Sequence, residues 1–221
     1  MEWTEIIILI LEIIGTISFA ISGAFVAIKV RFDIFGVLVI GTITAVGGGI
    51  MRDILIGNVP PTIFSRVYIL LIACATSLAV FLISNKHRKK LDGVREKVEN
   101  VNNLFDAMGL ATFTVMGTEL AFSNGIGDNA FLALVLGVLT GVGGGLLRDI
   151  LTETQPYIFK KHVYAVAAIS GAGLYYLLRF FTENTLVSGL LAILFIISVR
   201  ILARKYRWEL PKIQIEEEVE S

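Results

Sequence analysis

A ten-residue stretch occurs twice in this chain of 221 residues, as VGGGIMRDIL at residues 46–55 and as VGGGLLRDIL at residues 142–151. The two copies differ only at two neighbouring apolar positions. A duplicated stretch of this kind indicates an internal repeat, and a repeat decides the architecture before any other motif. The similarity continues outward at nearly constant spacing and pairs these residues: Phe35 with Phe131, Gly41 with Gly137, Thr44 with Thr140, Pro60 with Pro156, Val67-Tyr68 with Val163-Tyr164, and Gly15, Phe19 and Gly23 with Gly109, Phe113 and Gly117.

The chain around the repeat is strongly apolar. Hydrophobic side chains make up 55% of it and charged ones 17%, whereas a soluble domain carries about a quarter charged residues. The mean hydropathy is +0.78. Runs of about 18 or more apolar residues are long enough to cross the roughly 30 Å hydrocarbon core of a bilayer. Seven such spans are predicted, at residues 6–28, 34–57, 67–84, 104–122, 130–151, 163–181 and 186–203.

Spans one to three match spans four to six. Because three is an odd number, the second unit enters the bilayer from the opposite face, and a two-fold pseudo-axis in the membrane plane relates the two units. The predicted fold is therefore an all-α membrane protein with seven transmembrane helices, an inverted 3+3 repeat plus a seventh helix. The predicted segments are a first repeat (1–84), a basic cytoplasmic loop (85–103), a second, inverted repeat (104–182), a seventh helix (183–208) and an acidic, disordered tail (209–221).

Basic residues in short loops predict the orientation, because Lys and Arg remain on the cytoplasmic side. They follow the first, third, fifth and seventh spans, all on one side of the membrane, while the opposite loops have only Arg66 and Arg179 close by. We expect a multi-pass protein of the cell membrane with its N-terminus outside and its C-terminus in the cytoplasm. The first span has no basic segment before it and no cleavage site after it, so we expect a permanent helix and not a signal peptide.

The glycine triads allow two interpretations. Three glycines in a row cost a helix about 1 kcal/mol each relative to alanine and favour a kink or a break. A broken helix would leave backbone groups to line a path for cations. Alternatively, the small residues allow two helices to approach closely. The candidate pore residues are the triads and the threonines one turn before them, which either offer hydroxyls to an ion or bond their own helix: Gly47, Gly48, Gly49, Gly143, Gly144, Gly145, Thr44 and Thr140.

Each triad is followed by an Arg-Asp pair, Arg52-Asp53 and Arg148-Asp149. Neighbouring residues on a helix point about 100° apart, so each arginine is expected to find a partner elsewhere. Charges inside a membrane suggest a function, here at the pore mouth or in gating. At a helix end they also serve as anchors that reach the headgroups. Of the remaining acidic residues, Asp106 is expected at the interface, and Glu12 and Glu119 are expected to face protein or water.

Several classes of function lack the residues they need. His87 and His162 stand in separate loops, the single Cys74 excludes an internal disulfide, and no glycine loop ends in Lys-Ser or Lys-Thr. Metal, nucleophile and phosphate-binding sites are therefore not expected. We expect no enzyme activity, no cofactor and no nucleic-acid partner.

The duplicated Gly-Gly-Gly-x-x-Arg-Asp element in a three-plus-three-plus-one layout resembles the prokaryotic branch of the trimeric intracellular cation (TRIC) channels. The resemblance implies a homotrimer in membrane lipid, with a K⁺- and Na⁺-permeable pore in each protomer bounded by the kinked second and fifth helices. Animal members carry a Lys-Glu-Val element linked to phosphoinositide binding. The matching stretch here, Gly117-Thr118-Glu119-Leu120, has no lysine. Bacterial relatives also carry the label glycine transporter, so a carrier of a small zwitterion is the alternative.

Overall fold

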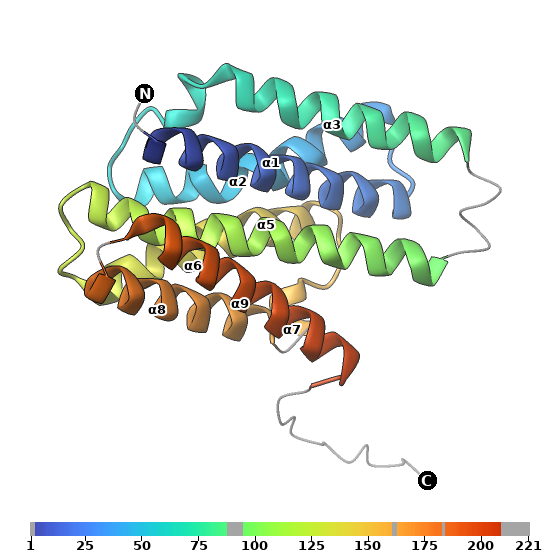
Figure 1. The fold of residues 1–221 in the computed structure, drawn as a ribbon. Coiled ribbons are helices and arrows are strands. Elements are labelled where there is room, and N and C mark those ends of the chain that lie inside the picture. Colours follow the sequence, from blue (N-terminus) through green and yellow to red (C-terminus); the bar gives the residue numbers. More distant parts are fainter. Residues whose placement is uncertain (1–2, 88–94, 161–162, 183, 209–221) are drawn as a thin grey trace, which may run out of the picture.

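The computed structural model describes residues 3–87, 95–160, 163–182 and 184–208, and within these ranges all regular structure is helical (Figure 1). Seven long helices lie roughly side by side: α1 (Trp3–Lys29), α2 (Ile34–Leu55), α3 (Val67–Lys86), α5 (Arg95–Ser123), α6 (Ala130–Leu151), α8 (Tyr164–Thr182) and α9 (Thr185–Lys205). Two short helices, η1 (Thr62–Phe64) and α7 (Tyr157–Lys160), precede α3 and α8. The predicted all-α fold is confirmed.

Six of the long helices are apolar and long enough to cross a membrane. The exception is α5, which carries Asp106, Glu119 and three threonines among its apolar residues. It lies in the middle of the bundle and packs against α1, α6, α8 and α9 (Figure 1). Its polar residues therefore face other helices, which explains how a helix of moderate hydropathy serves as the fourth span.

The predicted spans agree with the helices to within a few residues, except at one end. Helix α5 begins at Arg95, nine residues before the predicted start of the fourth span, so the second half of the predicted loop 85–103 is helical. This extension contacts the ends of α1 and α9, because Glu99 forms an ion pair with Lys29 and its carbonyl accepts from Arg204. The acidic tail lies outside the described residues, as does the middle of the basic loop.

Two ends of the bundle are distinguished below. The end where α1 begins is called the N-face, and the opposite end, where α9 finishes, is called the C-face. Helices α1, α3, α6 and α9 run from the N-face to the C-face, and α2, α5 and α8 run back (Figure 1). Among the described loop and helix-end residues, the C-face carries most of the basic ones: Lys29, Arg31, Lys86, Arg204, Lys205 and Arg207.

The inverted repeat is visible in the packing. Helices α1, α2 and α3 correspond to α5, α6 and α8, and the four inner helices α1, α2, α5 and α6 pack against one another. The rings of Phe19 and Phe113, which are counterparts in the two repeats, lie 5.4 Å apart between their centroids. Because two counterparts touch only where a two-fold axis passes between them, this contact places the pseudo-axis in the centre of the bundle.

The glycine triads lie where α2 and α6 cross. Both helices are continuous α-helix through their triads, so the expected break is wrong. A Cβ atom on Gly48 would collide with the carbonyl oxygen of Thr140, and one on Gly144 would collide with that of Thr44. The triads thus bring two backbones into close contact, and this packing offsets the helix-propensity cost of the glycines.

Candidate functional site: an N-face cavity and a buried C-face ion cluster

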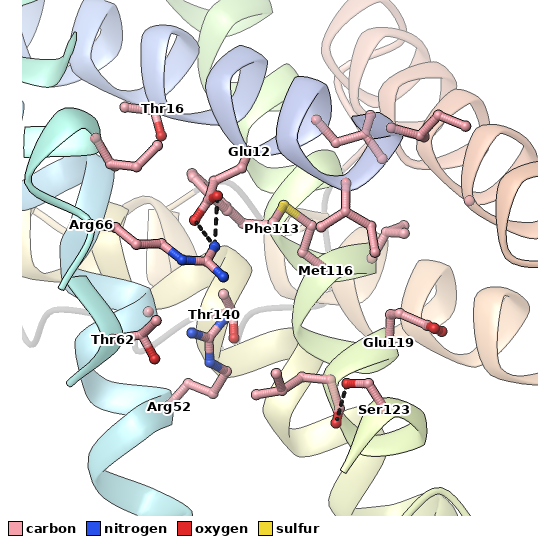
Figure 2. A pocket seen from close by; sticks show the side chains of 18 of the residues that line it. Glu12, Thr16, Arg52, Thr62, Arg66, Phe113, Met116, Glu119, Ser123 and Thr140 are labelled. Atoms are coloured by element: carbon pink, nitrogen blue, oxygen red, sulfur yellow. Dashed lines mark hydrogen bonds and ion pairs between the residues drawn. The ribbon is translucent and has the colours of Figure 1, made fainter. Parts of the chain in front are cut away.

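A cavity of about 340 Å³ enters the bundle from the N-face. Helices α1, α2, α5 and α9 supply most of its wall, and α6 contributes Thr140. Figure 2 shows polar and charged side chains projecting into it from several helices. Since the lining residue Arg66 keeps 45% of its side chain exposed, the cavity communicates with the surface. We call it the N-face cavity.

Two ion pairs stand in the wall of the N-face cavity. The Arg66 guanidinium donates to both carboxylate oxygens of Glu12, at 3.1 and 2.9 Å, and these two side chains point toward one another in Figure 2. Arg52 donates to Asp53 at 3.0 and 2.7 Å. A third carboxylate, Glu119, accepts from the Tyr175 hydroxyl at 2.6 Å and forms an ion pair with Arg179. Each of these three carboxylates is thus paired with an arginine at the wall of the N-face cavity.

Two threonine hydroxyls lie at the inner part of the cavity. The Thr16 hydroxyl oxygen is buried and has no hydrogen-bond partner within the described residues. Buried polar atoms almost always have a partner, so this hydroxyl stands out among the residues that line the cavity. The Thr140 hydroxyl donates to the Leu136 carbonyl at 2.6 Å, and its oxygen keeps acceptor capacity. Thr44 bonds Ile40 in the same way but does not line the cavity.

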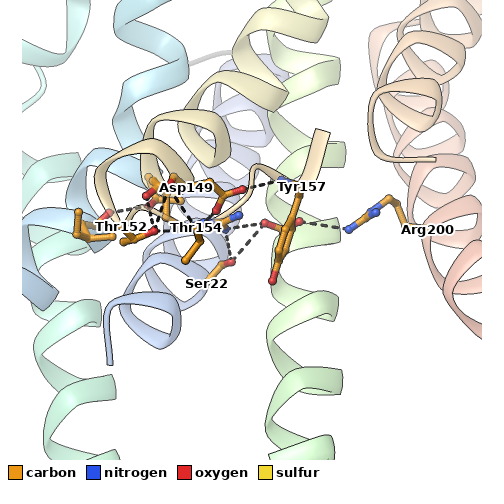
Figure 3. Close-up of polar contacts among 10 residues, drawn as sticks. Ser22, Asp149, Thr152, Thr154, Tyr157 and Arg200 are labelled. Atoms are coloured by element: carbon orange, nitrogen blue, oxygen red, sulfur yellow. Dashed lines mark hydrogen bonds and ion pairs between the residues drawn. The ribbon is translucent and has the colours of Figure 1, made fainter. Parts of the chain in front are cut away.

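At the C-face the counterparts of Arg52, Asp53 and Glu12 form a buried cluster (Figure 3). The Arg148 guanidinium donates to Asp149, to Asp106 and to the Ser22 hydroxyl, each at 2.8 Å. Arg200 from α9 approaches the second Asp106 oxygen at 3.4 Å. We call Ser22, Asp106, Arg148, Asp149 and Arg200 the C-face cluster. Its two arginines and two carboxylates balance in charge, which is the condition for burying them.

Two tyrosines cover the arginines of the C-face cluster. The Arg148 guanidinium carbon lies 4.9 Å from the centre of the Tyr157 ring, and that of Arg200 lies 4.5 Å from the centre of the Tyr164 ring. These are cation–π distances. Burial raises the pKa of the Tyr157 phenol, with the Asp106 charge acting in the same direction, so this ring remains neutral beneath the guanidinium.

The arginines of the two Arg-Asp pairs were expected to bond residues other than the adjacent aspartate. Each arginine bonds the aspartate next to it, because a long guanidinium side chain can fold back although the two Cβ atoms point apart. Among the described residues, only Arg148 of the two also finds partners on other helices. Asp106, expected at the interface, is fully buried. The expectation for Glu12 and Glu119 is confirmed, since both face protein or the cavity.

The second oxygen of each aspartate holds the segment that follows its helix. Asp53 accepts from the backbone N–H of Thr62, and Asp149 accepts from that of Tyr157, both at 2.8 Å. Thr62 and Tyr157 are the first residues of η1 and α7. The first N–H groups of a helix have no carbonyl partner within the helix, and the aspartate carboxylate accepts from them instead. The motif therefore joins a transmembrane helix to the loop after it, in both repeats.

The predicted site residues fall into three groups in the structure. Gly49, Arg52, Asp53 and Thr140 line the N-face cavity. Arg148 and Asp149 belong to the C-face cluster. Gly145 lies beside the C-face cluster, next to Tyr164 and Arg148. The remaining residues lie at or beside the crossing of α2 and α6: Gly47, Gly48, Gly143, Gly144 and Thr44.

Several functional candidates were absent from the sequence prediction, namely Thr16, Ser22, Tyr157, Tyr164, Tyr175 and Arg200. Most of them are common polar residues inside apolar spans, where one sequence offers no signal. The exception is Arg200, which lies near the end of the last apolar run, because charged residues inside membrane spans are rare. Asp106 also had a signal, because the spacing that pairs Gly15 with Gly109 pairs it with Glu12.

Together, the fold and site define a polytopic helical membrane protein with two inverted three-helix repeats. Each repeat matches the family model described as glycine transporter, at residues 9–85 and 103–179. The chain is 35% identical over 211 residues to the UPF0126 inner membrane protein YadS of Escherichia coli K12, covering 94% of this chain and 96% of the relative. It is 36% identical over 209 residues to the UPF0126 membrane protein YvgT of Bacillus subtilis, covering 91% and 94%.

Solved TRIC structures have the same fold. A structure determined to explain conductance through TRIC cation channels is 36% identical, with a TM-score of 0.80 over 94% of this chain and 97% of that one. A prokaryotic TRIC channel crystallised in 0.5 M KCl is 33% identical, with a TM-score of 0.82 over 93% and 100%. The chain therefore belongs to the TRIC family, as the repeated motif indicated.

Proposed function

We propose that this protein is a monovalent cation channel, permeable to K⁺ and Na⁺, that acts as a homotrimer with one path in each protomer. The similar solved structures are described as cation channels, one in a potassium salt, and a third, from Rhodobacter sphaeroides, as a trimeric intracellular cation channel orthologue. The observation that carries the proposal is the N-face cavity, because it brings carboxylates and an unpaired hydroxyl to the inside of a single protomer.

Within this proposal, the path enters at the N-face cavity, passes Thr16 and Thr140, and is closed at the C-face cluster. The Arg-Asp pairs stand at its two ends, Arg52-Asp53 at the entrance and Arg148-Asp149 in the barrier. Hydroxyl and carboxylate oxygens suit a partly dehydrated cation. Because the described basic residues gather at the C-face, that face is assigned to the cytoplasm and the N-face to the outside of the cell membrane.

Single-channel recording of the purified protein in planar bilayers tests the proposal. Unitary K⁺ currents that persist when Cl⁻ is replaced by gluconate are the expected result. A protein that inserts as a folded trimer and passes no K⁺ or Na⁺ current at any voltage or Ca²⁺ concentration would contradict it.

A second candidate function is a carrier for a small zwitterion such as glycine. Two observations favour it: the family model is described as a glycine transporter, and the N-face cavity presents guanidinium and carboxylate groups side by side. Saturable uptake of labelled glycine into proteoliposomes, with counterflow and without unitary current, would select this function over the channel.

A further inference from the structure

The N-face cavity has an apolar part as well as a charged part. Two arginines reach it from α2 and from the residue before α3, Arg52 and Arg66. Helices α1 and α9 contribute mainly apolar side chains: Ile7, Ile8, Leu11, Leu186 and Leu190. Apolar side chains do not bind a partly dehydrated cation. A cavity with both kinds of surface suits an amphiphile, a molecule with a charged head and an apolar chain.

The apolar part of the cavity borders the membrane between α1 and α9. Both helices pack against α5, which lies between them, and they make little contact with one another (Figure 1). Leu186 and Leu190 line the cavity and keep 39% and 49% of their surface exposed. They belong to a helix that is long and apolar enough to span the membrane, so their outer surface faces lipid. An acyl chain in the bilayer therefore lies within reach of the cavity.

The charge that the cavity wall presents is mainly positive, although its ion pairs are balanced. In each pair the arginine is more exposed than its carboxylate: 45% for Arg66 against 16% for Glu12, 22% for Arg179 against 16% for Glu119, and 15% for Arg52 against 3% for Asp53. A ligand that enters the cavity meets guanidinium groups before it meets carboxylates. An anionic head is therefore complementary to this surface.

The guanidinium of Arg66 has unused donors. Its Nη1 atom makes both bonds to Glu12, and within the described part of the chain its Nε and Nη2 atoms have no hydrogen-bond partner. These two atoms form the edge of a guanidinium that binds a carboxylate through two parallel bonds. Arg52 uses the same two atoms to bond Asp53. Figure 2 shows the guanidinium groups of Arg66 and Arg52 projecting into the same space.

We propose that the N-face cavity binds a long-chain carboxylate, a fatty acid that enters from the bilayer. Its carboxylate bonds the Nε and Nη2 atoms of Arg66 and faces Arg52, and its chain lies along the apolar residues between α1 and α9. Negative and positive groups then alternate, in the order Glu12, Arg66, ligand and Arg52. The binding does not depend on the proposed function. Its consequence does, because a bound chain occupies the proposed ion path and reversibly blocks it.

Photolabelling of the purified protein in proteoliposomes tests the site. The probe is dodecanoic acid with a diazirine in its chain, and the labelled residues are located by mass spectrometry. We expect labels at residues 7–11 of α1 and 186–190 of α9, and unlabelled dodecanoate should remove them by competition. Dodecanol lacks the charge that Arg66 binds, so it should compete at least about tenfold less well.

Other competitors distinguish the fatty acid from alternative ligands. Equal competition by dodecanol would mean an apolar groove without a carboxylate site. Equal competition by acetate would mean a site for small free anions, and stronger competition by dodecyl phosphate would assign the site to a phospholipid head. Each of these three results would overturn the proposal.

Two substitutions in one ion pair should act in opposite directions. Arg66→Gln should lower the labelling at least about tenfold, and Arg66→Lys should restore only part of it, because an ammonium cannot make two parallel bonds. Glu12→Gln removes a neighbouring negative charge and should raise the labelling about threefold. Lys29→Gln, which breaks an exposed ion pair at the C-face, is the control. A fall in labelling for both Arg66→Gln and Glu12→Gln would mean that the pair acts only in folding and would overturn the proposal.

A further variant covers the case in which Arg66→Gln fails to fold. Leu190→Trp keeps every charge and fills the apolar part of the cavity, so it should also lower the labelling, and unchanged labelling would contradict the position of the chain. Recording K⁺ current with and without dodecanoate separates this site from the channel. Labelling without any current would leave the site in place and contradict the channel, whereas current without labelling would overturn the site alone.

Discussion

The N-face and C-face contain the same motif and behave differently. Both have an Arg-Asp pair that holds the following loop, and both have an acidic residue on the first helix of the repeat. At the N-face these groups border a cavity with partly exposed side chains. At the C-face they are fully buried, joined by Arg200 and covered by two tyrosines. The comparison teaches that local geometry follows from the repeated residues, whereas opening and closure depend on groups outside the motif.

The two faces are expected to differ most in the loss of stability that follows when the acidic partner of an arginine is removed. Asp106→Ala leaves two buried guanidinium groups short of a negative charge, which costs about 3–5 kcal/mol of unfolding free energy. Thermal unfolding in detergent should show a midpoint lower by roughly 6–20 °C. Glu12→Ala removes a partly exposed pair, costs about 0–1 kcal/mol, and is the matched control. Equal midpoints for the two variants would show that the faces are energetically alike.

Glycine substitutions where α2 and α6 cross should change stability by similar amounts in the two repeats, whichever face is open. Gly48→Ala and Gly144→Ala each drive a Cβ atom into a backbone carbonyl of the other helix, and each should cost about 1–3 kcal/mol. At Gly49 the nearest atom to an added Cβ is Arg52 Nη2 at 3.7 Å. Gly49→Ala is therefore expected to be neutral or to gain up to about 1 kcal/mol through helix propensity. Thermal unfolding measures all three, and a cost at Gly49 matching that at Gly48 would refute the packing role.

The smallest expected effect concerns ion flow at the N-face. Arg52→Gln removes a positive charge from the cavity wall and leaves Asp53 without its ion-pair partner, so the local potential becomes more favourable for cations. Unitary K⁺ conductance should rise by about twofold at low salt and by less at high salt. Lys29→Gln, at the exposed C-face surface, should leave it unchanged. A fall in conductance for Arg52→Gln would place the path elsewhere.

Much of the fold could be predicted from the repeat. The duplicated decapeptide and the odd number of spans led to the inverted arrangement, and apolar length placed the helices. The helix break could not be judged, because glycine propensity is the same whether a helix is interrupted or packed against another backbone. The decision depended on Thr44 and Thr140 carbonyls that lie next to Gly144 and Gly48 only after folding.

The site was harder to predict for a different reason. Because VGGGxxRDIL is the same in both repeats, the motif itself carries no information on which end is open. The two ends differ in their other contacts. Arg66 forms an ion pair with Glu12 at the N-face, and Arg200, on a helix outside the repeat, bonds Asp106 at the C-face. Contacts between residues 54 or 94 positions apart leave no local pattern in a single sequence.

The contact between the rings of Phe19 and Phe113 also shows how the two repeats fit together. A contact between two counterparts across a two-fold axis is self-complementary, as is the interface of a symmetric dimer. It is the interface that one three-helix unit would make with an oppositely inserted copy of itself. The present chain therefore has the geometry of an antiparallel dimer of three-helix units within one polypeptide, and α9 lies outside both units.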